Sequence, residues 1–167
     1  MKRIVLSAAR SAALSAVLAL ACHGASAQLP NPYGLPINLE AAKRIADAAV
    51  ADAQRRGFRM AVAVTDPNGE LVYFEKMDAT QIASVQVSIQ KAVSATIYKR
   101  PTKKFQDVLA AGGDGLRVLR LDRAMPVEGG LPLLVDGKII GAIGCSGDTS
   151  ANDGLVCQAG ADALNPR

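Results

Sequence analysis

Few residues of this 167-residue sequence can carry chemistry, because its single histidine, His23, lies in a segment typical of a signal peptide. That segment starts with basic residues, continues with an apolar stretch of about 11 residues, and ends in the small-residue pattern at 25–27 that signal peptidases cleave. We expect a signal peptide over 1–27 and a mature chain that begins at Gln28. Without histidine, the mature chain has no Ser-His-Asp or Cys-His catalysis, no HExxH zinc site and no imidazole-ligated haem.

The net charge falls once the signal peptide is set aside. The whole chain has 19 Lys+Arg against 15 Asp+Glu, a formal charge of +4, and residues 1–27 hold three of the basic residues and none of the acidic ones. A nearly neutral mature chain without Trp argues against a nucleic-acid partner. The apolar stretch is shorter than the ~20 residues of a membrane span, so we expect a periplasmic or secreted protein without one. A lipoprotein cleavage box over 19–22 is the weaker alternative, since Ala stands where Leu is usual.

The remaining candidates for ligand binding are a lysine and two glycine-containing segments. Lys91 lies at the edge of an apolar helix face; facing inward it could bind a carboxylate, and facing outward it is solvated. Gly129 and Gly130 can bring the backbone close to a ligand or another subunit, or form a tight bend. Ser146 and Gly147, where a strand meets a helix, can offer backbone N–H groups to an anion or permit close packing.

One dense basic run and a few soft ligands complete this set. Lys99, Arg100, Lys103 and Lys104 form either a face for acidic groups or a solvated helix junction. The other conceivable ligands of haem iron, each more typical of packing, are Tyr33, Tyr73, Tyr98, Met60, Met77 and Met125.

Two cysteines, Cys145 and Cys157, remain in the mature chain. Export would place them in an oxidising compartment, where they could form a disulfide. Two small buried thiols are an equal alternative, because the sequence does not fix the distance between their Cα atoms.

Hydrophobic periodicity predicts one domain over 38–167, preceded by a proline-rich tether over 28–37. Strands that arrive in hairpins predict an antiparallel sheet with helices packed on it, an α+β fold. The second helix is expected to begin after a cap at Asp78 or Thr80 and to pack Ile82 with its apolar face. The expected elements, in chain order, are a helix over 39–56, a hairpin of 60–65 and 71–76, a helix to about 98, a short helix over 103–110, an ambiguous stretch over 116–125, a hairpin of 131–135 and 138–145, and a helix over 151–164.

Several short segments stand in a characteristic order and spacing over about 39–164. They are MAVAVTDPNGEL (60–71), KAVSAT (91–96), Pro101-Thr102, PVEGGLP (126–132), Asp136-Gly137, IGAIGCSG (140–147), Asp153 and QAGADAL (158–164). Together these segments resemble the GlcG/HbpS family, which includes the C-terminal domain of PduO.

The resemblance implies a profilin-like sandwich that commonly assembles as a homo-oligomer. Exported relatives of the HbpS type bind haem and have been linked to haem degradation and to sensing of redox stress. PduO-type members are thought to use histidine toward haem, which this mature chain lacks. The HbpS-type mode implies Thr102 as the residue facing the iron, with Lys103 or Lys104 as partners of the propionates.

Two hypotheses about function follow. The first is an exported haem-binding protein that serves haem scavenging, storage or redox-linked sensing. The alternative is an enzyme or accessory protein acting on a small hydroxy or aromatic carboxylic acid, with Lys91, Gly129-Gly130 and Ser146-Gly147 around its pocket. No acid–base pair of suitable spacing supports catalysis, so the sequence leaves open whether the protein is an enzyme.

Overall fold

The computed structural model describes residues 30–164, so the predicted signal peptide lies outside the described part. Helices and antiparallel hairpins alternate as the sequence predicts, which confirms the α+β fold. No helix within 30–164 is long and apolar enough to cross a membrane. The elements are α2 (Leu39–Arg56), β1 (Ala61–Thr65), β2 (Leu71–Lys76), α3 (Ser84–Ile97), α4 (Lys103–Ala110), the 3-10 helix η2 (Gly113–Arg120), β3 (Gly130–Val135), β4 (Lys138–Ser146) and α5 (Ser150–Asp162).

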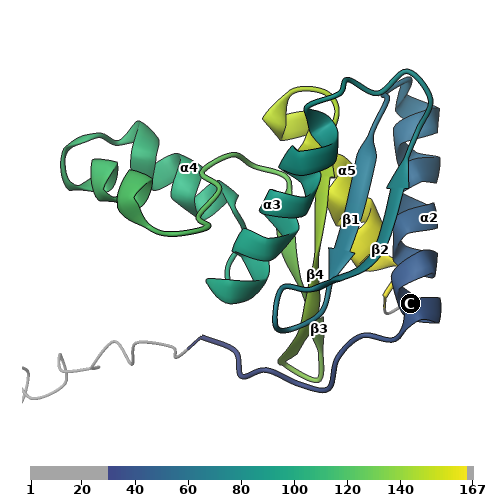
Figure 1. Cartoon of the computed structure of the whole chain (residues 1–167), viewed down its shortest axis with the longest axis horizontal. Coiled ribbons are helices and arrows are strands. Elements are labelled where there is room, and N and C mark those ends of the chain that lie inside the picture. Colours follow the sequence, from purple (N-terminus) through teal and green to yellow (C-terminus); the bar gives the residue numbers. More distant parts are fainter. Residues whose placement is uncertain (1–29, 165–167) are drawn as a thin grey trace, which may run out of the picture.

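The four strands form one antiparallel sheet in the order β2-β1-β4-β3 (Figure 1). The central strands β1 and β4 pair with Val62 opposite Cys145. In the β3–β4 turn, Asp136 and Gly137 have φ angles of 49° and 72°, as the predicted type I′ turn requires. The described part of the predicted tether lies along β4, where Tyr33 bridges to Ile139.

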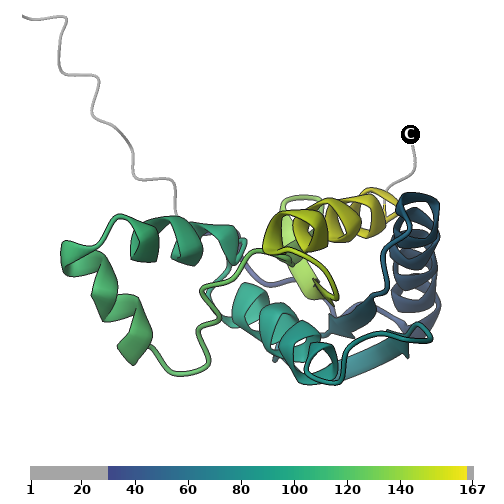
Figure 2. The same ribbon diagram turned by 90° about the horizontal axis from the view of Figure 1, so that it is seen from above.

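Helices cover both faces of the sheet (Figure 2). α2 and α5 pack together on one face, and α3 lies on the other. The apolar core lies between the sheet and the α2–α5 layer, where Ile143 and Val156 are fully buried. The predicted alanine stripe of α2, which includes Ala46 and Ala49, is also fully buried, so this helix lies close to its neighbours.

α3 begins later than the sequence predicts. Its first residue is Ser84, and Ile82 precedes it with 93% of its surface exposed, so the predicted caps and the predicted packing of Ile82 are wrong. Thr80 does not cap the helix because its hydroxyl donates to the carbonyls of Met60 and Met77. Tertiary hydrogen bonds thus hold this turn against the first hairpin and delay the helix.

The face of α3 that meets the sheet carries small and polar side chains rather than large apolar ones. A Cβ atom on Gly144 of β4 would lie 3.1 Å from the Cβ of Ala92 and closer still to the helix backbone at Ser88. The helix backbone therefore approaches the sheet too closely for larger side chains. Val85 and Ile89, which the pattern places on the packed face, are only partly buried.

α4 and η2 form an arm that projects from the body of the molecule (Figures 1 and 2). Gly115 lets η2 pack on α4, since a Cβ there would meet the backbone of Val108. The hydroxyl of Tyr98, at the end of α3, donates to the carbonyl of Asp122 at 2.6 Å, and its ring packs edge-on against Phe105. These contacts tie both ends of the arm to the end of α3. The ambiguous stretch 116–125 is thus the end of η2 followed by a segment without helix or strand.

Candidate functional site

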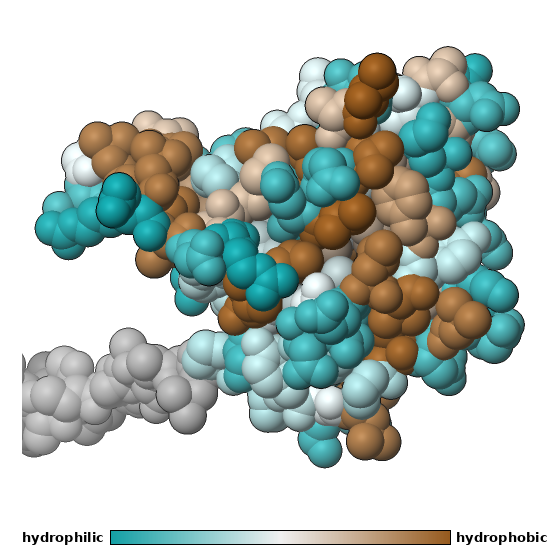
Figure 3. Space-filling model, viewed as in Figure 1, coloured by the Kyte–Doolittle hydropathy of each residue, from teal (hydrophilic) through white to brown (hydrophobic). Residues whose placement is uncertain are grey.

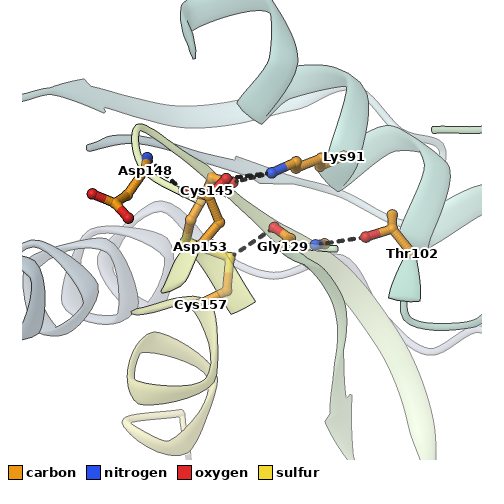
Figure 4. Close-up of a disulfide and its surroundings, with 8 residues drawn as sticks. Lys91, Thr102, Gly129, Cys145, Asp148, Asp153 and Cys157 are labelled. Carbon is orange, nitrogen blue, oxygen red and sulfur yellow. Dashed lines mark hydrogen bonds and ion pairs between the residues drawn. A yellow bond between two sulfur atoms is a disulfide. The ribbon is translucent and has the colours of Figure 1, made fainter. Parts of the chain in front are cut away.

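A buried ion pair lies among the residues that the sequence analysis singled out (Figure 4). Lys91 of α3 donates from Nζ to Asp153 Oδ2 at 2.6 Å and to the carbonyl of Cys145 at 3.0 Å. The two charged side chains are 1% and 3% exposed. Lys91 therefore faces inward, and the pair joins α3, the end of β4 and the first turn of α5.

Burial acts against the charged form of each partner. It lowers the pKa of Lys91, although the hydrogen bond and the charge of Asp153 act in the opposite direction. It raises the pKa of Asp153, against the hydrogen bonds that this carboxylate accepts from Lys91 and from the backbone N–H groups of Asp148 and Gly147. Each charge is tolerated in the interior because the other one neutralises it.

The backbone of Gly129 lies directly against the ion pair. Its φ angle is 119°, and a Cβ at this position would lie 2.8 Å from Lys91 Nζ and 2.8 Å from the Cβ of Asp153. The carbonyl of Gly129 accepts a hydrogen bond from the backbone N–H of Cys145 at 2.8 Å. Only glycine fits here, and the group that its backbone approaches is the ion pair of the chain itself.

Cys145 and Cys157 form a disulfide between β4 and α5, with their Cα atoms 5.6 Å apart (Figure 4). Both residues are fully buried. Cys157 Sγ lies 3.1 Å from the carbonyl oxygen of Gly129, which is a packing contact because a disulfide sulfur has no proton to donate. Since Cys145 also gives its carbonyl to Lys91, the disulfide and the ion pair hold the same part of β4.

Thr102 is fully buried at the start of α4. Its hydroxyl accepts a hydrogen bond from the backbone N–H of Gly130 at 2.9 Å, and its own N–H donates to the Gly130 carbonyl at 3.0 Å. These two hydrogen bonds dock α4 on the first residue of β3. Because Thr102 is fully buried, its hydroxyl is not open to a ligand on the surface.

The structure brings most of the predicted binding residues together, but it places them in the interior. The carboxylate that meets Lys91 comes from the chain itself, and the Ser146 hydroxyl lies 3.2 Å from that of Ser84. Asp153, which entered only through the family resemblance, is the partner of Lys91 that the sequence did not predict. One signal was available in the sequence: α5 has a carboxylate in its first turn and no basic residue of its own to pair with it. The interior set comprises Lys91, Thr102, Gly129, Gly130, Cys145, Ser146, Asp153 and Cys157.

A groove of about 490 Å³ lies on the surface where the arm meets the end of α3. Phe105 and Val118 are 4% and 7% exposed, while Val108 and Leu121 remain 47% and 43% exposed. Its volume lies within the range of small-molecule sites. This basic groove is lined by Pro30, Lys99, Arg100, Lys104, Phe105, Val108, Val118 and Leu121.

The basic groove combines an apolar wall with unbalanced positive charge. Lys99, Arg100 and Lys104 line it, and none of the described residues in its lining is acidic. The Arg100 guanidinium lies 5.4 Å from the centroid of the Phe105 ring, so cation and aromatic ring are neighbours. Lys103 differs from Lys104, because it pairs with Asp107 at 2.7 Å and does not line the groove. This arrangement suits a flat apolar ligand that bears carboxylates.

Other grooves of similar size carry balanced charge or little charge. In one of about 460 Å³ beside β2, acidic and basic side chains occur together. In another of about 430 Å³ beside α3, Arg123 has Asp122 as a neighbour and Met125 also contributes to the lining. A third, of about 340 Å³, is lined mainly by apolar side chains and shares Lys99 with the basic groove. The basic groove therefore has the strongest preference for an anionic ligand among these four.

A model of the family described as "Haem degrading protein HbpS-like" matches residues 37–162. The chain belongs to the HbpS-like family. The protein GlcG of Escherichia coli K12 is 33% identical over 110 residues, which cover 66% of this chain and 81% of that protein. The GlcG/HbpS resemblance that the motifs indicate is thus confirmed.

Solved structures of HbpS-like proteins share the fold. A double mutant of HbpS from Streptomyces reticuli superposes with a TM-score of 0.73 at 28% identity, covering 79% of this chain and 89% of that one. PduOC, whose structure is a complex with haem, gives a TM-score of 0.71 at 25% identity and covers 78% of this chain and 96% of that one. The HbpS-like fold is therefore found in a protein that holds haem.

Proposed function

We propose that this HbpS-like protein binds haem and that the basic groove is the site. The observation that carries the proposal is the meeting of Lys99, Arg100 and Lys104 with an apolar wall in a groove whose described lining has no acidic side chain. Haem has the complementary chemistry, a flat apolar ring with two propionates. The haem complex of PduOC supports this choice of ligand.

The residues present fit the ring and the propionates of haem. Val108 and Leu121 are the exposed apolar side chains on which a ring can pack, and Phe105 and Val118 add the small parts of their surface that remain exposed. Within the described residues, Lys104 makes no ion pair, so its three N–H donors can be given to a propionate. Bound haem would supply a redox-active iron. These side chains would bind and orient the haem ring and its propionates.

A titration of the mature protein with haemin tests this function. We expect a shifted Soret band that saturates at a defined stoichiometry. A spectrum that stays that of free haemin at micromolar protein would overturn the proposal. If aromatic or hydroxy acids raise the melting temperature and haemin does not, the alternative function on small carboxylic acids is the better one.

We also propose that the protein acts outside the cytoplasm, in haem scavenging, storage or redox-linked sensing. The signal-peptide pattern at 1–27 supports export, and so does the fully buried disulfide, because such bonds persist mainly in oxidising compartments. Expression of the full chain followed by cell fractionation tests this. We expect periplasmic or secreted protein whose first residue is Gln28; cytoplasmic protein that retains 1–27 would contradict it.

Assembly as a homo-oligomer is part of the same proposal. Large apolar side chains are exposed on the arm and before α3, among them Ile82 (93%), Leu119 (63%) and Leu116 (54%). Figure 3 shows apolar surface both on the arm and along the face over α3. Exposed apolar surface of this extent is typical of interaction sites. Light scattering should give a multiple of the subunit mass, which Ile82→Glu should lower; a monomer at all concentrations would contradict assembly.

A further inference from the structure

The lining of the basic groove offers no ordinary ligand for haem iron. Haem iron is usually held by His, Met, Tyr or a Cys thiolate. The described residues that line the groove carry only apolar carbons, two lysine amines and one guanidinium. A protonated amine has no lone pair to give. The groove therefore fits the ring and carboxylates of haem but not its metal.

Several conceivable iron ligands outside the groove are already engaged in other contacts. Thr102 Oγ1 is buried against Gly130 N, and Met77 Sδ lies 3.3 Å from Met60 N in the interior. Tyr98, the phenol nearest the groove in sequence, donates to the Asp122 carbonyl at 2.6 Å. Cys145 and Cys157 are joined to each other.

None of the other tyrosines and methionines in the described part of the chain lines the groove. Tyr73 donates to Glu75 Oε2 at 3.4 Å, and Met60 is fully buried. Tyr33 donates to the Thr96 carbonyl at 3.0 Å, and its ring lies under Lys99 Nζ at 4.1 Å from the centroid. Met125 contributes to the separate groove beside α3. The described lining of the basic groove thus offers no side chain of the kinds that usually hold haem iron.

We infer that the basic groove recognises flat apolar dicarboxylates by ring and carboxylate and is indifferent to a central metal. This inference rests on the proposed function and narrows its ligand class to tetrapyrroles with or without iron, metal-free porphyrin included. Recognition comes from packing on the apolar wall, mainly Val108 and Leu121, and from charge-assisted hydrogen bonds to the three cations of the groove. None of these contacts involves the iron.

Parallel titrations with haemin and with metal-free protoporphyrin IX test the inference on the mature protein. We expect the two dissociation constants to agree within about threefold, read from absorbance for haemin and from fluorescence for protoporphyrin IX. The dimethyl ester of protoporphyrin IX, which lacks the carboxylates, should bind at least tenfold more weakly. Haemin binding that is tenfold or more tighter than protoporphyrin IX binding would overturn the inference and leave haem binding itself intact. If neither ligand binds, the proposed function and the inference both fail.

Two variants show whether a hidden iron ligand contributes. Thr102→Val removes the hydroxyl implied by the family resemblance, and Met125→Leu removes the thioether of the groove beside α3. We expect both variants to bind haemin within twofold of the wild type and to leave the haem spectrum unchanged. Loss of haemin affinity in either variant, with protoporphyrin IX affinity retained, would assign an iron ligand and overturn metal indifference. Far-ultraviolet circular dichroism of each variant confirms that the domain is folded.

Discussion

Lys91 Nζ lies 2.6 Å from Asp153 Oδ2 in the interior, and the same amine donates to the carbonyl of Cys145, whose sulfur is bonded to Cys157. One charged pair and one covalent bond thus fix α3 and α5 to the end of β4. Lys91 and the two cysteines are among the residues whose types first indicated chemistry. Their arrangement instead makes them part of the structural centre of the domain, and the binding site that we propose is the basic groove on the surface.

Removal of one partner of the ion pair should destabilise the domain strongly. Lys91→Met leaves the carboxylate of Asp153 buried without its cation, and we expect a loss of about 3–5 kcal/mol in the free energy of unfolding. Urea unfolding measures it. The double variant Lys91→Met, Asp153→Leu should lose less than the sum of the two single variants, because it leaves no unpaired charge. Additive losses would show that the two groups do not interact.

Gly129 should tolerate no side chain. Gly129→Ala places a Cβ 2.8 Å from Lys91 Nζ at a φ of 119°, so both steric contact and backbone strain oppose it. We expect a loss of about 2–4 kcal/mol by urea unfolding. Gly57→Ala is the matched control, because Gly57 is in the left-handed region with a φ of 77° and a Cβ there meets nothing within 4 Å. Its cost should be about 1 kcal/mol, and equal costs at both sites would contradict the close contact.

The disulfide should stabilise the domain by restricting the unfolded chain. Cys145 and Cys157 are 12 residues apart, and closing a loop of that order is worth about 3 kcal/mol. We therefore expect the double variant Cys145→Ala, Cys157→Ala to unfold at a lower urea concentration. Its free energy of unfolding should be lower by about 3 kcal/mol. Both residues are fully buried, so the native protein should resist dithiothreitol until it unfolds. Rapid labelling of native protein by a thiol reagent under reducing conditions would contradict this.

Local signals in the sequence account for much of the fold. Asp136-Gly137 defines the β3–β4 turn because type I′ geometry needs positive φ at both residues. Asn38 caps α2 by accepting the N–H of Ala41 at 2.8 Å, as its side chain predicts. The start of α3 could not be predicted in this way, because the bonds from Thr80 that delay it join residues 20 positions apart in the chain.

The candidate site was harder to predict because it depends on contacts distant in sequence. Lys91 and Asp153 are 62 residues apart, and no local pattern pairs them. The basic run containing Lys99 and Lys104 was visible in the sequence as either a face for acidic groups or a solvated helix junction. These two interpretations differ only in which side chains lie beside the run. The arm brings Val118 and Leu121 to the end of α3, and this apolar wall beside the basic run is what supports the proposed binding face. That placement depends on how η2 folds, and this stretch was ambiguous.

The most direct test of the account is haemin affinity after charge reversal in the basic groove. The double variant Arg100→Glu, Lys104→Glu replaces two cations of the groove. The control is the double variant Lys43→Glu, Arg44→Glu, which makes the same change of charge on the exposed surface of α2. An exposed ion pair is worth up to about 1 kcal/mol, so we expect a rise of at least tenfold in the haemin dissociation constant for the groove variant. The control should stay within twofold of the wild type. Equal affinities in both variants and the wild type would show that haem binds elsewhere and would contradict the basic groove as the site.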